Sequence, residues 1–290
     1  MIIDVIAPSG SFPAQDLATL RAYIESKGHT ARIPADILGP DLLSANSDIA
    51  RFKQLEAALY AKDSDLIWCV RGGYGATRLL PELTRLPIPK QKKTLIGFSD
   101  ITALHLFLSQ KWGWPTIHGA SLRQMAKSDL GEQSIQLTEA LIFDKKPVID
   151  YALTPFNAAA QKPVSIKANL SGGNVKLIEA SLATDWQIDD QAKILILEEV
   201  NEYDYRVDRS LMHFIQSGVF TSVQAIILGD FTHETTAHEA KIEAVLNRFA
   251  AHTPIPVFRL PGIGHGKENF PWFYKPASIR AGRLQQKNEV

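Results

Sequence analysis

The stretch Ile96-Gly97-Phe98-Ser99-Asp100-Ile101-Thr102 decides the fold class of this 290-residue chain and suggests its chemistry. An apolar run ends at Gly97, and after Ser99 the pattern becomes that of an amphipathic helix with Ile101, Leu104 and Leu108 on one face. Such a strand–turn–helix unit presents the Ser99 hydroxyl at the carboxyl end of a strand, with the next backbone N–H free. Ile101 stands where the nucleophile elbow G-x-S-x-G has its second glycine, so the motif predicts a nucleophile but is incomplete.

The alternation of strand and helix extends on both sides of this stretch. Strands are predicted at residues 2–6, 66–70, 94–97 and 116–118, with helices between them, which implies a parallel sheet covered on both faces. From about residue 145 to Pro163 the pattern dissolves, and strands return at 164–168, 193–197 and 225–228. We therefore expect an α/β fold with a doubly wound, mostly parallel N-terminal domain over 1–145 and a linker over 146–163. A smaller, β-rich α/β domain would follow over 164–290, with the active site at the interface of the two domains.

Composition excludes several classes of protein. Lysine plus arginine and aspartate plus glutamate balance at 31 each, so no net field favours nucleic acid or an anionic membrane. The single cysteine, Cys69, excludes an intramolecular disulfide framework and a cysteine-based zinc site. No apolar run approaches the roughly 20 residues of a membrane span, and the first residues are typical of a strand rather than a signal peptide. The expectation is a cytoplasmic protein without nucleic-acid or membrane partners.

A serine nucleophile needs a base, and eight histidines are available. Most fall on helix faces or helix ends. His118 closes a predicted strand before Gly119, which could place it beside Ser99. His265 lies in Pro261-Gly262-Ile263-Gly264-His265-Gly266, a loop that can bring an imidazole into a cleft or can be an ordinary exposed turn.

The chain also offers an acid and an oxyanion site. Glu198 and Glu199 follow the buried run 194–197 and point to opposite faces if the strand persists, so only one can meet a histidine. Backbone N–H donors are available in Gly72-Gly73-Tyr74-Gly75 and at Asp100. Phosphate binding is the alternative for this glycine-rich loop, but Arg78 occupies the last glycine position of G-x-G-x-x-G. The histidines of the segment 233–238 are five apart rather than four, so no metal site and no cofactor is predicted.

Taken together, these motifs resemble the LD-carboxypeptidase family of serine peptidases, which includes the microcin C immunity peptidases. The resemblance covers most of the chain. It runs through Ala7-Pro8-Ser9-Gly10, the segments 71–75 and 97–103, His118-Gly119, Gly172-Gly173-Asn174, the segments 197–202 and 205–209, Leu228-Gly229-Asp230-Phe231 and Gly264-His265-Gly266. The chain departs from the family where Glu199 and Asn201 replace a frequent aspartate and glycine, and where Ala183 replaces a frequent glycine.

The resemblance implies roles that spacing leaves open. Ser99 would be the nucleophile, His265 the base and Glu198, rather than Glu199, the acid, with the N–H groups of Gly73 and Asp100 as oxyanion donors. The family reaction is hydrolysis of an L,D-peptide bond that releases C-terminal D-alanine from murein tetrapeptides in cell-wall recycling. The resemblance also implies a homodimer.

A carboxypeptidase must also bind the carboxylate of its small peptide substrate. Arg71 and Arg206 are the candidates for this contact, although either could form a structural ion pair. Tyr74 and His118 complete the predicted substrate-binding residues, and Tyr203 and Tyr205 could line the cleft or be buried.

Two other functions stay open. One is a microcin C-type immunity peptidase that cleaves aminoacyl-nucleotide conjugates, with Trp186, Trp272, Phe273 and Tyr274 available as an aromatic platform for the base. The other is a non-catalytic binding protein with an amidotransferase-like domain.

Overall fold

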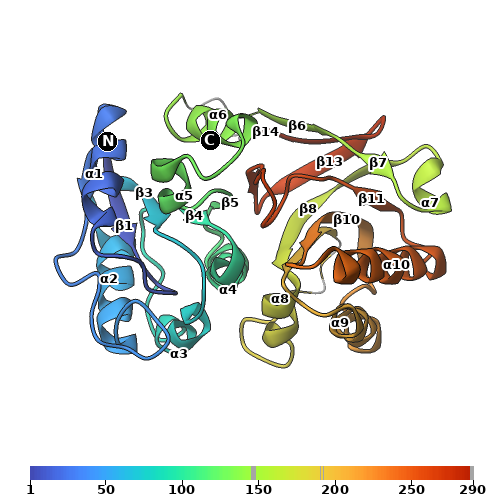
Figure 1. Ribbon diagram of the computed structural model, residues 1–290, viewed down its shortest axis with the longest axis horizontal. Coiled ribbons are helices and arrows are strands. Elements are labelled where there is room, and N and C mark those ends of the chain that lie inside the picture. The colour runs from blue at the N-terminus through green and yellow to red at the C-terminus, as the bar shows by residue number, and fades with distance from the viewer. Residues whose placement is uncertain (145–147, 190, 192, 288–290) are drawn as a thin grey trace.

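Two sheets organise the chain, as the computed structural model shows (Figure 1). The structure describes residues 1–144, 148–189, 191 and 193–287. In Figure 1 the blue-to-green N-terminal half lies on the left, and most of the yellow-to-red half lies on the right. The two-domain α/β fold expected from the sequence is confirmed.

The first sheet has the strand order β12-β5-β4-β3-β1-β2. The strands β1 (Ile2–Ile6), β2 (Thr30–Arg32), β3 (Ser64–Cys69), β4 (Thr94–Gly97) and β5 (Thr116–His118) are parallel. Its helices are α1 (Asp16–Ser26), α2 (Asp48–Tyr60), α3 (Leu80–Leu83), α4 (Thr102–Lys111), α5 (Leu122–Lys127) and α6 (Glu132–Ile142). Two 3-10 turns, Ala76–Leu79 and Ser99–Ile101, follow β3 and β4. The strands β1, β3 and β4 are almost entirely apolar because helices cover both faces of the sheet.

The second sheet has the order β6-β14-β13-β8-β9-β10-β11-β7. Its parallel centre consists of β8 (Ser165–Asn174), β9 (Lys193–Val200), β10 (Val223–Thr232) and β11 (Val257–Arg259). Antiparallel strands extend it on both sides: β13 (Pro276–Arg280), β14 (Arg283–Lys287), β6 (Val148–Ala152) and β7 (Thr154–Pro155). The helices are α7 (Ala158–Gln161), α8 (Val175–Ser181), α9 (Asp204–Gln216) and α10 (Thr236–His252).

The structure differs from the predicted linker over 146–163. Residues 146 and 147 lie outside the described part of the chain, but β6 and β7 are paired strands of the second sheet. In β6 the side chains of Ile149 and Tyr151 are buried and alternate with exposed ones, the period-two pattern of a strand. This short pattern could not be recognised in the sequence because prolines and the run Ala158-Ala159-Ala160 lie close to it.

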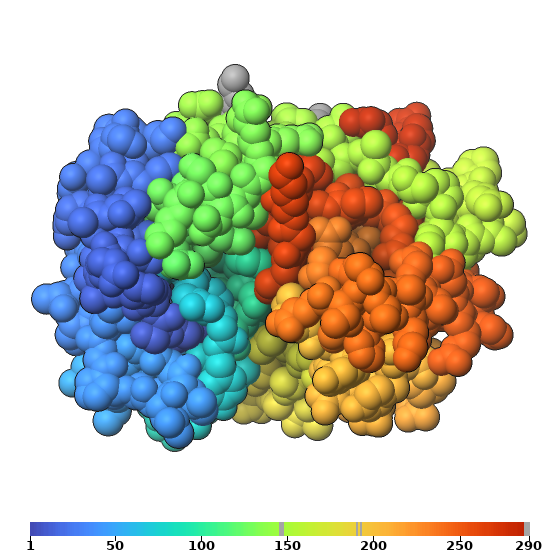
Figure 2. All heavy atoms as spheres, in the orientation of Figure 1, coloured from blue at the N-terminus to red at the C-terminus, as the bar shows by residue number. Residues whose placement is uncertain are grey.

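The end of the chain returns to the first sheet. The strand β12 (Trp272–Phe273) pairs antiparallel with β5, Trp272 opposite His118 and Phe273 opposite Ile117. In Figure 2, deep-orange to red residues from the last part of the chain fill the seam between the blue-to-green half and the orange half. Residues 261–275, which lie between β11 and β13 of the second sheet, therefore connect the two sheets.

Candidate active site

Ser99 lies on the tight turn that joins β4 to α4. Its φ is 64°, in the left-handed region that a non-glycine residue occupies at a cost of roughly 1–2 kcal/mol. A strained residue at this position is typical of a nucleophile turn. A Cβ on Gly72 would lie 2.8 Å from the Ser99 Cβ, so the neighbouring loop can approach the serine only through a glycine.

Ile101 occupies the position of the missing glycine without displacing the serine. Its side chain is completely buried, and a Cβ on Gly97 would lie 3.0 Å from the Ile101 Cγ1. Gly97 therefore makes room for Ile101, and the turn keeps its shape with one glycine instead of two.

His265 and Glu198 form the acid–base pair beside Ser99. The His265 Nδ1 donates to the Glu198 Oε2 at 2.8 Å, and the Glu198 side chain has no exposed surface. Burial alone would lower the pKa of His265, but the charge and hydrogen bond of Glu198, with smaller contributions from Glu199 and Asp230, raise it above its usual value. With Nδ1 engaged, Nε2 remains as the nitrogen that can accept a proton.

Two further features hold the imidazole in place. Gly264, at φ 124°, passes so close to the acid that a Cβ there would lie 2.8 Å from the Glu198 Oε2. Asp230, near the end of β10, accepts from the Gly262 N–H at 3.1 Å, and its own N–H donates to the Ile263 carbonyl at 2.8 Å. Asp230 therefore fixes the loop that carries His265, a role that was not predicted from the sequence.

Glu199 points away from His265. Its carboxylate accepts from the Asn174 Nδ2 at 2.8 Å, from the Lys176 N–H at 3.0 Å and from the Val200 N–H at 2.9 Å. Burial, followed by the charge of Glu198, raises the pKa of Glu199 to about 7. The two glutamates thus point in different directions, as strand alternation predicts, and only Glu198 bonds to the histidine.

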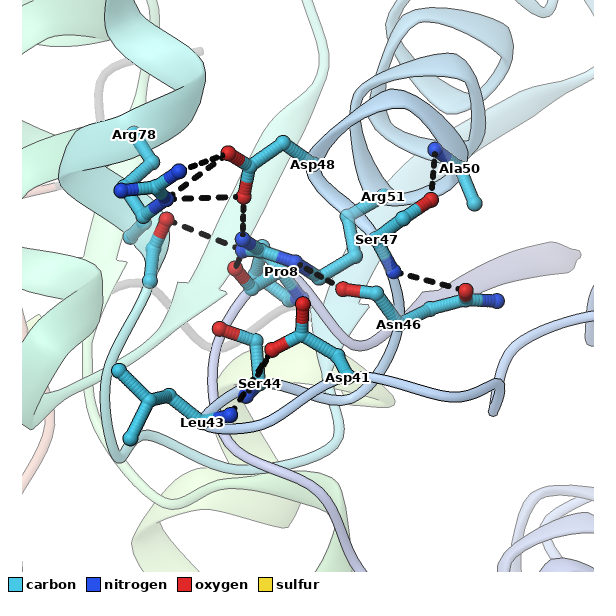
Figure 3. A network of polar contacts seen from close by, with 12 residues as sticks. Pro8, Asp41, Leu43, Ser44, Asn46, Ser47, Asp48, Ala50, Arg51 and Arg78 are labelled. Atoms are coloured by element: carbon cyan, nitrogen blue, oxygen red, sulfur yellow. Dashed lines mark hydrogen bonds and ion pairs between the residues drawn. The ribbon is translucent and has the colours of Figure 1, made fainter.

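Arg51 anchors the glycine-rich loop after β3, and Figure 3 shows its polar contacts. The buried guanidinium donates to the Gly75 carbonyl at 3.0 Å, to the Asn46 carbonyl at 2.9 Å and to the Pro8 carbonyl, and it pairs with Asp48 at 2.5 Å. Arg51 therefore ties the loop after β1 to the glycine-rich loop after β3.

The Asp100 carboxylate connects the same two loops to the nucleophile turn. Its Oδ2 accepts from the Ser9 hydroxyl at 2.5 Å and from the Ala76 N–H at 2.8 Å. Burial raises the pKa of Asp100, and these two hydrogen bonds oppose the rise. At Gly73, with φ 121°, a Cβ would lie 2.9 Å from the Gly10 Cα. The loops that carry the predicted oxyanion donors are thereby locked against each other.

A pocket of about 170 Å³ opens over these groups. Of the predicted site residues, Ser99, His265, Gly73 and Arg71 line it, while Glu198 lies behind the imidazole. Three residues at the start of α5 also line the pocket and were not predicted from the sequence: Ser121, Arg123 and Gln124. Ser121 and Gln124 form a capping box at the start of α5, and the spacing S-x-x-Q is a signal from which this helix start could have been predicted.

Three predicted substrate-binding residues lie outside this pocket. His118 has no exposed surface, so it does not fit the predicted contact with substrate. It stacks on Trp272 at 5.1 Å, and burial, with the nearby His105 next, lowers its pKa well below the usual value. Tyr74 is 47% exposed, and Arg206 pairs with Glu202 at 3.4 Å and lies over the rings of Tyr203 and Tyr205.

Within the described ranges, no three His, Cys, Asp or Glu side chains gather closely enough to hold a metal ion. None of the described helices has the length and apolar character needed to cross a membrane.

Comparison with known proteins identifies the family of this chain. Residues 3–119 match the LD-carboxypeptidase N-terminal domain, and residues 167–277 match the LD-carboxypeptidase C-terminal domain. The murein tetrapeptide carboxypeptidase of Pseudomonas aeruginosa is 30% identical over 294 residues, which cover 98% of this chain and 94% of that protein.

Solved structures share the fold of this chain. The muramoyltetrapeptide carboxypeptidase of Oxalobacter formigenes has a TM-score of 0.84 at 26% identity and covers 98% of this chain and 97% of its own. An MccF-like protein of Bacillus anthracis shares the fold, with a TM-score of 0.81 at 19% identity over 98% of this chain and 95% of its own. With two matched domains and a full-length relative at this identity, the chain belongs to the LD-carboxypeptidase family of peptidases.

Proposed function

We propose that this protein is a cytoplasmic serine carboxypeptidase that hydrolyses an L,D-peptide bond and releases C-terminal D-alanine from murein tetrapeptides in cell-wall recycling. The observation that carries the proposal is the 2.8 Å hydrogen bond from His265 to the buried Glu198, in the wall of the pocket that Ser99 also lines. The names of the relatives in Pseudomonas aeruginosa and Oxalobacter formigenes support the substrate class.

The reaction would follow the logic of a serine–histidine–acid triad. The His265 Nε2 takes the proton of the Ser99 hydroxyl as its oxygen attacks the carbonyl carbon of the penultimate residue. Glu198 holds the Nδ1–H tautomer and stabilises the imidazolium. The N–H groups of Gly73 and Asp100 would bind the oxyanion, and Arg71 would bind the substrate carboxylate. The tetrahedral intermediate collapses as His265 returns the proton to the leaving amine, and D-alanine departs. A water molecule deprotonated by the same histidine then hydrolyses the acyl-enzyme.

The experiment is incubation with L-Ala-D-Glu-meso-diaminopimelyl-D-Ala, with free D-alanine as the readout. Wild-type protein should release D-alanine and Ser99→Ala should not, although both fold. Unchanged release by Ser99→Ala would refute the hydrolytic role of the serine.

The fold of the MccF-like structures raises the alternative of an aminoacyl-nucleotide peptidase. That function would need an aromatic surface on which the nucleobase can stack. The four candidates are too buried for this role, since none is more than 8% exposed: Trp186, Trp272, Phe273 and Tyr274. Turnover of an aminoacyl-sulfamoyl adenosine without D-alanine release would nevertheless favour that function. Ligand binding that Ser99→Ala leaves intact, with no turnover by either protein, would indicate a binding protein. The homodimer stays a prediction that solution scattering can test.

A further inference from the structure

The pocket that holds Ser99 and His265 is cationic. Arg71 and Arg123 both line the pocket, which also holds the nucleophile and the base. Within the described part of the chain, Asp16 is the one acidic side chain that forms an ion pair with either arginine, and it pairs with Arg123 and Lys127 at 2.7 Å each. Asp16 is shared between Arg123 and Lys127, and Arg71 has no ion pair within the described residues, so the pocket favours an anionic group.

Arg123 is held in a fixed direction. Its Nε donates to the Asp16 Oδ2 at 2.7 Å, and its backbone N–H donates to the Val70 carbonyl at 3.1 Å. Asp16 is only 4% exposed, and its hydrogen bonds to Lys127 and Arg123 lower its pKa. Because a guanidinium has five N–H donors, this anchor leaves the outer edge of Arg123 available for a planar acceptor.

Ser121 and Gln124, which also line the pocket, bond to each other. The Gln124 Oε1 accepts from both the N–H and the hydroxyl of Ser121 at 3.1 Å. Arg71, in contrast, donates from Nη1 to the Ser11 carbonyl at 3.0 Å, its only hydrogen bond within the described residues. The other N–H groups of Arg71 and Arg123, together with the Gln124 Nε2, are therefore available to a carboxylate.

The size of the pocket limits what can follow the scissile bond. A volume of about 170 Å³ is below the roughly 300–1,000 Å³ of ordinary ligand pockets, which favours a small leaving residue such as alanine.

We propose that Arg123, positioned by Asp16, binds the free α-carboxylate of the departing amino acid together with Arg71. These residues then form the subsite of the leaving residue, and they favour cleavage of the last bond, next to the free carboxylate. This inference rests on the proposed carboxypeptidase function.

The test compares the tetrapeptide with its C-terminal amide, measuring kcat/KM for release of D-alanine and of D-alaninamide. Arg123→Gln should reduce kcat/KM for the acid about 10- to 100-fold, in the range of a lost hydrogen bond to a charged group, and should leave the amide nearly unchanged. Asp16→Asn should act in the same direction but more weakly, and the double variant should be less than additive because the two residues act through one contact. Arg123→Lys should restore part of the preference.

Arg206→Gln is the matched control, because Arg206 lies outside the pocket and should keep the preference for the acid. An Arg123→Gln protein with the wild-type melting temperature and an unchanged preference would overturn the inference. Equal losses on acid and amide would also overturn it, since they would indicate a merely structural role. If wild-type protein cleaves neither peptide, the proposed function itself fails, and the two failures are thereby distinguishable.

Discussion

Glu198→Gln is the sharpest test of the acid–base pair, because it removes one charge and keeps the volume of a completely buried side chain. The base must be neutral, so kcat/KM rises with pH through the pKa of His265, which lies above its usual value in the wild-type protein. The carboxylate is 2.8 Å from Nδ1, and an opposite charge at such a distance typically shifts a pKa by about one to three units. Without it, the lowering of the pKa of His265 by burial is opposed only by the smaller effects of Glu199 and Asp230. The acid limb of the profile should therefore move to lower pH by about one to three units.

The plateau value of kcat/KM in the same pH profile reports how strongly the enzyme stabilises the transition state. Loss of a charge-assisted hydrogen bond costs about 1.5–3 kcal/mol, which corresponds to roughly a 10- to 150-fold lower kcat/KM. The loss is larger if the glutamine amide presents its NH₂ to Nδ1 and fixes the wrong tautomer. Glu199→Gln is the matched control, because Glu199 is buried next to Glu198 but bonds to Asn174. The reasoning is refuted if Glu198→Gln keeps the acid limb in place, or if Glu199→Gln gives the larger shift.

Three further predictions concern the buried carboxyl of Glu199, the glycine that contacts the nucleophile turn, and an alanine with a positive φ. Burial and the neighbouring Glu198 raise the pKa of Glu199 from 4.5 to about 7, so the free energy of unfolding should fall as pH rises between these values. Glu199→Gln should remove up to about 3 kcal/mol of that decline in urea titrations at pH 5 and pH 8, and an identical decline would contradict this assignment. Gly72→Ala should lower kcat at least about tenfold, because its Cβ would lie 2.8 Å from that of Ser99 and the serine would have to shift; full activity would count against the close approach. Ala183, exposed at φ 59°, should gain up to about 1 kcal/mol of stability as Ala183→Gly in chemical denaturation, and a loss would show that strain there is not relieved.

The sequence was sufficient for features that depend on local pattern. Strand periodicity and the turn at Ser99 predicted the two α/β domains, and the family's glycine positions are informative even where the glycine is missing. Ala183 and Asn201, which replace frequent glycines, adopt φ values of 59° and 54°. The backbone keeps the left-handed turn even though the residue type has changed.

Features that depend on distant contacts could not be predicted in this way. Arg123 and Asp16 are 107 residues apart, and neither belongs to a motif that signals a partner. His118 ends a strand, as predicted, but nothing local showed that β12 would cover its ring. The two residues of β12 are too few for a periodic pattern, so their pairing with β5 appears only in the folded chain.

That pairing has a consequence for the order in which the protein matures. Chains emerge from the ribosome N-terminus first, and their domains generally fold as they appear. The first sheet can form early, but one side of β5 stays an open edge until Trp272 and Phe273 arrive, and unpaired edges invite aggregation. His265 is made only seven residues earlier than Trp272. A nascent chain therefore contains Ser99 long before the serine can act as a nucleophile. The strand that closes the sheet and the histidine that completes the triad are synthesised at nearly the same time.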